Sequence, residues 1–353
     1  MYIRGFALEI PAARCIIEVN KYVGIHVFTI FPHKHTYIMA QLITGIHHIT
    51  AMADDSQKNV DFYTGILGLR LVKKTVNFDA PDVYHFYYGD ESGNPGSILT
   101  FFPFQGIHKG RRGKGMLNTT SFSVPSASLN YWQERLMKFG VTPKPPQERF
   151  EKETVIYFED QDGLGLELVF NDADSRPGFS YGQIPTEHAV KGFYNVEIWE
   201  EGYERTAALL TEQMDHKLIA ESGNRFRFAA NDSPGNYVDI LCSPDSLRGL
   251  SGGGTVHHIA FATPDHATQE AAREKLRMMN PTPILDRSYF TSIYFREPGG
   301  VLFEIATAGP GFATDETKDH LGEALKLPLQ YEPMRAELNE SLPPVFVDIE
   351  KFR

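Results

Sequence analysis

A four-fold internal repeat constrains the fold of this chain more than any other feature. Two copies can be recognised by eye, because residues 45–50 (GIHHIT) and 255–260 (TVHHIA) each place a His-His pair at the start of a short apolar stretch. In both copies a polar turn follows, then a segment of helix-favouring residues, and then three strand-like stretches separated by turns. In the copy that begins at residue 255, these stretches are residues 282–288, 292–297 and 300–306. Repeats of this size indicate that one supersecondary unit is used several times, so we predict a βαβββ unit for each copy.

Two weaker copies lie between them and begin at residues 117–124 and 190–199. A chain of 353 residues also exceeds a single hydrophobic core, which stops growing near roughly 250–300 residues. The predicted fold is therefore α+β, with four βαβββ modules arranged as two domains of paired modules. The expected segments are an N-terminal extension (1–40), a domain with the first two modules (41–172), a linker (173–188), a domain with the last two modules (189–309) and a C-terminal tail (310–353).

The first forty residues differ from the rest of the chain. They hold apolar residues without a steady period, whereas Met39 directly precedes the first clear strand. We expect residues 1–38 to be an upstream extension and Met39 to be the physiological start, the alternative being an N-terminal element that packs on the domain. His33 and His35 form an HxH pair that we interpret as part of a solvated loop, because no acidic partner is near.

Composition excludes several classes of protein. The chain has 34 Lys and Arg against 45 Asp and Glu, a net charge of −11, and such an acidic surface repels the phosphates of nucleic acids. The two cysteines, Cys15 and Cys242, make no disulfide framework. No apolar run is long enough to span a membrane, and the N-terminus lacks the order of a signal peptide. We therefore expect a cytoplasmic protein with no nucleic-acid or membrane partner.

The repeat and its motifs point to a family. The His-His-Ile triplets at two strand starts and the Leu-Phe-Glu-Ile stretch at 302–305 resemble the vicinal oxygen chelate superfamily, over about residues 42–308. That superfamily includes glyoxalase I, extradiol dioxygenases and antibiotic-sequestering proteins, and in it paired modules curl their sheets around a cleft. The pattern is most similar to the ring-cleaving dioxygenases of para-hydroquinones. This resemblance implies that His48, His258 and Glu304 hold iron.

The chemistry of these residue types agrees with the resemblance. Two imidazoles and one carboxylate leave three positions open on a six-coordinate Fe(II), and Mn(II) accepts similar ligands. Only the first and fourth copies carry His at the first strand, so pairing these copies completes the set. Pairing the second copy with the third brings together Glu167 and Asp239 without a histidine, and we interpret that second cleft as structural.

Four further residues are predicted to act around the metal. Alternation along a strand places Thr50 on the same face as His48. The resemblance implies that His257 lies near the substrate, as an acid, base or hydrogen-bonding group, and that Arg287 and Tyr294 lie in the pocket, where they would stabilise an oxygen anion. The alternatives are a plain strand Thr, a surface Arg and a core Tyr. His47 is expected to be structural.

The predicted function is an Fe(II)-dependent dioxygenase that inserts O2 into a para-hydroquinone-type ring and gives a ring-opened, semialdehyde-type product. Three alternatives remain open: a catechol extradiol dioxygenase, a glyoxalase I-like lyase and a non-enzymatic small-molecule sequestering protein. Glyoxalase I needs a further acidic ligand at the end of the first copy, and residues 97–102 offer none. The expected partners are a small aromatic substrate and O2. A homo-oligomer also stays open, because an exposed sheet face in such modules often packs against another subunit.

Overall fold

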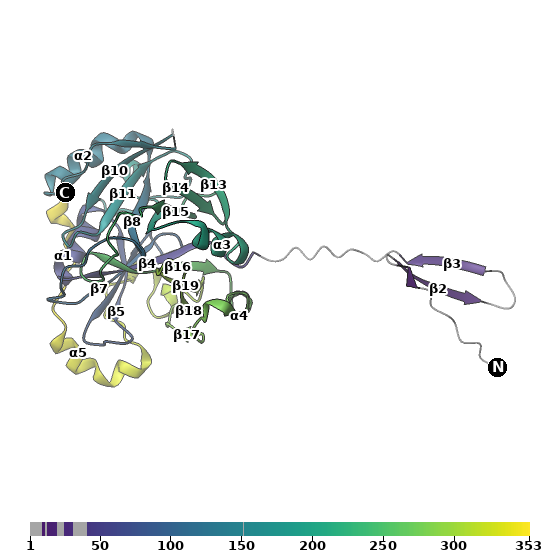
Figure 1. Ribbon diagram of the computed structural model, residues 1–353. Coiled ribbons are helices and arrows are strands. Elements are labelled where there is room, and N and C mark those ends of the chain that lie inside the picture. The colour runs from purple at the N-terminus through teal and green to yellow at the C-terminus, as the bar shows by residue number, and fades with distance from the viewer. Residues whose placement is uncertain (1–8, 11–12, 20–24, 31–40, 151) are drawn as a thin grey trace. The chain divides into compact units, whose positions relative to one another are not determined.

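The computed structural model describes residues 9–10, 13–19, 25–30, 41–150 and 152–353, and the chain divides into two compact units, Met1–Ala40 and Gln41–Arg353. The first unit contains a small antiparallel sheet of β1 (Glu9–Ile10), β2 (Ala13–Val19) and β3 (Ile25–Ile30) (Figure 1). The predicted HxH pair at 33 and 35 lies outside the described residues. That residues 1–38 are an extension stays a prediction.

The second unit is built on two curled eight-stranded sheets. The metal-side sheet, as we call it, has the order β17-β18-β19-β16-β4-β7-β6-β5. It joins the first repeat to the fourth, because β4 and β16 pair antiparallel at its centre. Its strands are β4 (Gly45–Ala53), β5 (Arg70–Val76), β6 (Tyr84–Gly89), β7 (Ile98–Pro103), β16 (Thr255–Thr263), β17 (Leu285–Asp286), β18 (Thr291–Arg296) and β19 (Leu302–Thr307).

The second sheet, which we call the arginine-side sheet, has the order β13-β14-β15-β12-β8-β11-β10-β9. It joins the second repeat to the third through antiparallel pairing of β8 and β12. Its strands are β8 (Met116–Val124), β9 (Gln147–Arg149), β10 (Glu153–Glu159), β11 (Gly165–Phe170), β12 (Gly192–Glu200), β13 (Lys217–Ser222), β14 (Arg225–Ala229) and β15 (Tyr237–Cys242).

These sheets confirm the predicted α+β class with four βαβββ modules. They also show how the modules combine: each sheet takes one module from residues 41–172 and one from 189–309, so both sheets cross the expected linker at 173–188. The domain boundaries themselves stay a prediction. The pairing of the first copy with the fourth is the one that completes the predicted ligand set.

One helix follows the first strand of each module. These helices are α1 (Ser56–Val60), which continues as a π-helical turn over Asp61–Ile66, α2 (Leu129–Lys138), α3 (Glu204–Gln213) and α4 (His266–Lys275). In the two metal-side modules an aspartate starts the helix in the same way, because the side chains of Asp55 and Asp265 accept hydrogen bonds from backbone N–H groups three residues later. Local sequence therefore sets where these helices begin.

One predicted strand is largely irregular. Residues 282–288 were expected to form the second strand of the fourth module, but β17 covers only Leu285–Asp286. The cause is a tight turn, in which Ser288 has a φ of +66° and the backbone N–H of Arg287 donates to the carbonyl of Phe290. Arg287 therefore lies on a turn beside the cleft rather than within a strand.

The C-terminal tail packs on the first module. The tail includes α5 (Arg335–Ser341; yellow in Figure 1). Leu325 of the tail forms a bridge with Lys74 on β5, the edge strand of the metal-side sheet. The neighbouring Lys73 is fully buried and its ammonium pairs with Asp315 and Glu316 of the tail. No helix among the described residues is long and apolar enough to cross a membrane.

Candidate metal centre

Strand register brings the three predicted ligands together. Ala260 on β16 is the cross-strand partner of His48 on β4 and also of Glu304 on β19. His258 lies two residues before Ala260 and therefore shares its face of the sheet. Three adjacent strands thus direct one side chain each to the same point, although the residues lie far apart in the sequence.

The ligand atoms converge closely. Nε2 of His258 lies 2.9 Å from Oε2 of Glu304, and Nε2 of His48 lies 3.3 Å from the same oxygen and 3.2 Å from Nε2 of His258. All three side chains are buried. They form a group of three His, Cys, Asp or Glu residues able to hold a metal, the one such group among the residues that the structure describes.

The state of Glu304 fits a metal ligand. Its Oε1 accepts a hydrogen bond from Ser292, whereas its buried Oε2 has no close polar neighbour among the described residues other than the two imidazole nitrogens. Burial by itself raises the pKa of Glu304, but the imidazoles of His48 and His258 outweigh burial and hold that pKa well below its usual range. Burial also lowers the pKa of His258. An ionised carboxylate and a neutral imidazole are the protonation states that bind a metal.

Hydrogen bonds orient the imidazole of His48. Nε2 of His47 lies 3.1 Å from the carbonyl of Thr307, which only accepts, so this nitrogen carries the hydrogen. Burial lowers the pKa of His47 to about 3, so its Nδ1 is a bare acceptor 2.9 Å from Nδ1 of His48. His48 then donates from Nδ1, which leaves the lone pair of its Nε2 directed at the ligand site. His47 was expected to be structural, and the doubled histidine is the signal for this orienting contact.

The fourth-module pair repeats this contact. Nδ1 of His257 lies 2.8 Å from Nδ1 of His258. If His258 offers the lone pair of Nε2 to a metal, its Nδ1–H donates to His257. In neutral His257 the hydrogen then sits on Nε2. Because His257 is exposed and lines the cleft, this N–H is available to a bound molecule.

Two of the candidate ligands, His48 and His258, line a cleft of about 570 Å³. Its walls are mostly aromatic and apolar, with the predicted His257, Arg287 and Tyr294 among them. The other lining residues include Met52, Asn77, Phe78, Asp79, Ala80, His85, Tyr87, Phe102, Phe104, Thr282, Leu285, Phe290 and Leu302.

Arg287 and Tyr294 form one unit in this cleft. Nε of Arg287 donates to the hydroxyl of Tyr294 over 3.3 Å, and the guanidinium lies 5.4 Å from the centre of the Tyr294 ring. The Tyr294 ring in turn meets the His258 ring edge-on, with centroids 5.7 Å apart. Burial raises the pKa of Tyr294, so its hydroxyl keeps its proton. The pair therefore offers a fixed positive charge and hydroxyl beside the ligand site.

Thr50 does not line the cleft. Its hydroxyl bonds to that of Thr100 over 2.8 Å, and Thr100 contacts Nε2 of His85, whose Nδ1 contacts the hydroxyl of Tyr87. The last two residues line the cleft, so Thr50 reaches it through a chain of hydrogen bonds. A catalytic role for Thr50 stays a prediction. His85 and Tyr87 were missed, although their spacing of two along one strand placed them on a common face.

Comparisons with known proteins agree with this site. Residues 45–168 match the model of the Glyoxalase/Bleomycin resistance protein/Dioxygenase superfamily. The "Putative ring-cleaving dioxygenase MhqO" of Bacillus subtilis is 43% identical over 308 residues, which cover 87% of this chain and 98% of the relative. The "Chlorohydroquinone/hydroquinone 1,2-dioxygenase" of Sphingobium indicum is 34% identical over 309 residues, 85% of this chain and 96% of the relative.

The chain belongs to the Glyoxalase/Bleomycin resistance protein/Dioxygenase superfamily. The predicted family is thus confirmed, and so is the prediction of an enzyme of the oxygenase class. The crystal structure of a "putative dioxygenase" from Bacillus subtilis is 43% identical and aligns over 87% of this chain and 98% of its own length, with a TM-score of 0.83. Glyoxalase I from Zea mays is 14% identical and aligns over 75% of this chain and 92% of its own length, with a TM-score of 0.57. It shares the fold.

The arginine-side sheet shows what this superfamily fold becomes without the histidines. There, Ser121 is the cross-strand partner of both Glu167 and Asn195, as Ala260 is of Glu304 and His48. Asn195 thus takes the position of His48, and only the glutamate is kept. A guanidinium nitrogen of Arg149 lies 2.9 Å from Glu167, where the other sheet presents imidazoles. Arg225 and Arg227 also form ion pairs with Asp239 on this sheet.

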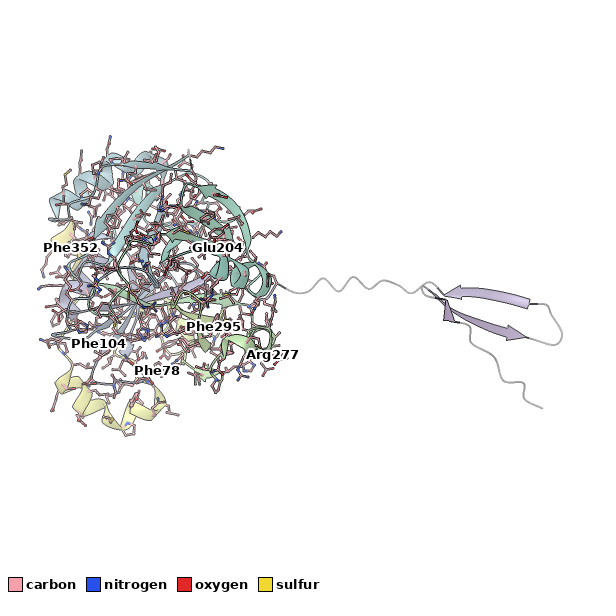
Figure 2. All side chains as sticks on the ribbon, in the orientation of Figure 1. Phe78, Phe104, Glu204, Arg277, Phe295 and Phe352 are labelled. Atoms are coloured by element: carbon pink, nitrogen blue, oxygen red, sulfur yellow. The ribbon has the colours of Figure 1, made fainter. Side chains whose placement is uncertain are left out.

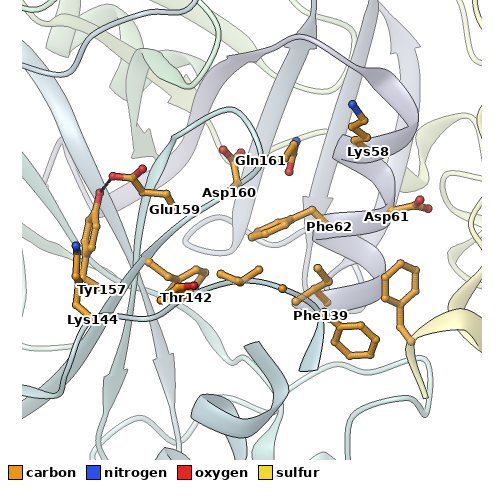
Figure 3. Close-up of a pocket in the computed structure, with 15 residues that line it drawn as sticks. Lys58, Asp61, Phe62, Phe139, Thr142, Lys144, Tyr157, Glu159, Asp160 and Gln161 are labelled. Carbon is orange, nitrogen blue, oxygen red and sulfur yellow. Dashed lines mark hydrogen bonds between the residues drawn. The ribbon is translucent and has the colours of Figure 1, made fainter. Parts of the chain in front are cut away.

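A further hollow of about 560 Å³ lies between the first and second modules (Figure 3). Phe62 and Phe139 give it an apolar side, and the hydroxyl of Tyr157 donates to Glu159 over 2.8 Å at its other side. Neither histidine nor cysteine lines it. Its carboxylates lack the nitrogen ligands that make the first cleft a candidate metal centre.

Proposed function

We propose that this chain is an Fe(II)-dependent dioxygenase that opens the ring of a para-hydroquinone and gives a semialdehyde-type product. One observation carries the proposal above all: His48 and His258, which line an aromatic cleft together with Arg287 and Tyr294, converge with the buried Glu304. Two relatives bear names that state ring cleavage and hydroquinone dioxygenation, which supports the same reaction class.

The donor set suits iron. Two imidazoles and one carboxylate on one side of a metal are typical of non-haem Fe(II) oxygenases, although Mn(II) accepts the same ligands. When bound, Fe(II) would supply the redox chemistry between the aromatic diol and dioxygen. The chain itself supplies binding, orientation and electrostatics.

Side chains around the ligands suit an aromatic diol. Phe290 packs against His48 with ring centroids 5.1 Å apart, and Phe102 and Phe104 line the same cleft, so a flat ring would meet apolar walls that exclude water. The Arg287 guanidinium would favour the anionic, phenolate form of a substrate hydroxyl. The Nε2–H of His257 would donate a hydrogen bond to a substrate oxygen.

The glyoxalase I alternative lacks its fourth ligand. Thr100 on β7 is the cross-strand partner of Thr50 on β4, as Glu304 on β19 is of Ala260 on β16. The position where the first module would present a further carboxylate therefore holds a hydroxyl that is already bonded to Thr50 and His85. The geometry thus favours a dioxygenase.

Oxygen uptake tests the proposal. Protein loaded anaerobically with Fe(II) is offered hydroquinone, methylhydroquinone and catechol in parallel, and oxygen consumption is followed together with the ultraviolet spectrum of the product. We expect stoichiometric uptake with the hydroquinones and little with catechol. An absence of uptake with all three, despite one bound iron per chain, would contradict the proposed reaction.

A further inference from the structure

The C-terminal tail contacts one wall of the metal-side cleft from outside. This wall is the turn between β5 and β6, and residues 77–80 of it line the cleft. The hydroxyl of Tyr331, on the tail, donates a hydrogen bond of 2.6 Å to the backbone carbonyl of Phe78 in this turn. Figure 2 labels Phe78 where the turn lies near the yellow tail.

The turn has hydrogen bonds of its own, and the contact with Tyr331 adds one from outside the turn. Within it, backbone bonds join Asn77 to Val83 and Ala80 to Asn77, and the side chain of Asn77 accepts from the N–H of Asp79. These bonds close the turn on itself. The bond from Tyr331 ties the Phe78 carbonyl to a separate part of the chain.

Phe78 connects the turn with the Arg287–Tyr294 pair. The Arg287 guanidinium lies 5.4 Å from the centre of the Phe78 ring, and the same guanidinium donates to Tyr294. A cation over an aromatic face is attracted to it, so the position of Phe78 influences where Arg287 rests. A continuous set of contacts therefore runs from Tyr331 through Phe78 to Arg287.

The tail is anchored independently of the cleft. The N–H of Lys326 donates to the carbonyl of Lys74 over 2.9 Å, and the N–H of Phe346 donates to Oε1 of Gln57 on α1 over 2.8 Å. These contacts lie on either side of Tyr331 in the sequence. The tail can thus hold Phe78 without support from the turn itself.

We propose that Tyr331 is a positioning residue for substrate. Its hydrogen bond to the carbonyl of Phe78 fixes the turn at residues 77–80 against the cleft, and the ring of Phe78 in turn fixes the position of the Arg287 guanidinium. The inference rests on the proposed function for the identity of the substrate, an aromatic diol. The ordering of residues 77–80 by the tail does not depend on that function.

The test compares Tyr331→Phe with Tyr84→Phe. Both variants lose only a hydroxyl, and the hydroxyl of Tyr84 also donates to a carbonyl of the tail, that of Pro343, over 3.0 Å, but Tyr84 does not line the cleft. In the iron-loaded full chain we expect Tyr331→Phe to raise the KM for hydroquinone about 3- to 10-fold, the effect of one lost hydrogen bond, with kcat within about two-fold. Tyr84→Phe should leave both constants unchanged.

Amide hydrogen exchange provides a readout without turnover. A peptide covering residues 77–83 should exchange faster in Tyr331→Phe than in the parent chain, and should not do so in Tyr84→Phe. Unchanged exchange and KM in Tyr331→Phe, or equal changes in both variants, would overturn the proposal. If the parent chain consumes no oxygen with any hydroquinone but exchange changes only in Tyr331→Phe, the proposed function fails and the ordering of the turn by Tyr331 stands.

Discussion

At the scale of single residues, two glutamates at equivalent positions have different surroundings in this chain. Glu304 and Glu167 hold equivalent positions in their modules, yet the first faces two imidazoles and the second an arginine. A carboxylate beside imidazoles offers a metal a complete ligand set, whereas one beside a guanidinium is already neutralised. The neighbours, rather than the glutamate, decide the chemistry.

Replacement of each glutamate by glutamine tests this difference. We expect Glu304→Gln to lose bound iron and to lower oxygen uptake more than about 100-fold, because an amide oxygen is a neutral and weaker ligand. Glu167→Gln is the matched control, and the fraction that stays folded should keep one iron per chain. Metal content is measured by elemental analysis of gel-filtered protein. Equal iron content in both variants would show that Glu304 is not a ligand.

At the scale of elements, two buried carboxyl groups lie between α3 and the turn joining β18 to β19. The hydroxyl of Thr206 lies 2.8 Å from Oε2 of Glu200 and 2.6 Å from Oε2 of Glu297, but it has one hydrogen to donate. Glu297 also accepts from the N–H groups of Gly299 and Val301, which suits its anion. Burial first, and then the charge of Glu297, raise the pKa of Glu200 to about 8. Glu200 therefore carries the proton at this contact.

This arrangement makes stability depend on pH. A carboxyl whose pKa is higher in the folded than in the unfolded chain stabilises the fold most below its unfolded value of 4.5, and this contribution is lost as pH rises through about 8. Glu200→Gln does not titrate. Between pH 5 and pH 9, the Tm of the parent chain should therefore fall by a few degrees more than the Tm of Glu200→Gln, as measured by calorimetry.

A surface variant controls for this effect. Glu201 is 84% exposed, so Glu201→Gln should follow the parent chain at every pH. A constant difference in Tm between the parent chain and Glu200→Gln over this range would contradict the assignment of the proton to Glu200.

At the scale of the whole molecule, the sheets hold the two halves of residues 41–309 together. Each eight-stranded sheet takes four strands from before the 173–188 stretch and four from after it. His48 comes from the first half, whereas His258 and Glu304 come from the second. The candidate metal centre therefore exists only when both halves are present.

Cleavage of the connecting stretch tests this arrangement. Gly182 is exposed, and a protease site inserted there should allow the backbone to be cut without disturbing either sheet. We expect the two fragments to elute as one complex in gel filtration and to retain iron, because two strand pairings, β4–β16 and β8–β12, join them. Fragments that separate and stay folded would instead indicate two independent domains.

The sequence by itself determined the repeat, the fold class, the family and the three candidate ligands. It could do so because these depend on local patterns: a doubled histidine at a strand start and a glutamate near a strand end. Each pattern is readable within one module.

Tertiary structure alone decided which neighbours surround each candidate ligand. The orienting contact from His47 to His48 depends on the carbonyl of Thr307, which is 260 residues away. The wall at Phe78 depends on Tyr331, 253 residues further along the chain. Such contacts follow from how strands and tail pack in space, and no local spacing in the sequence encodes them.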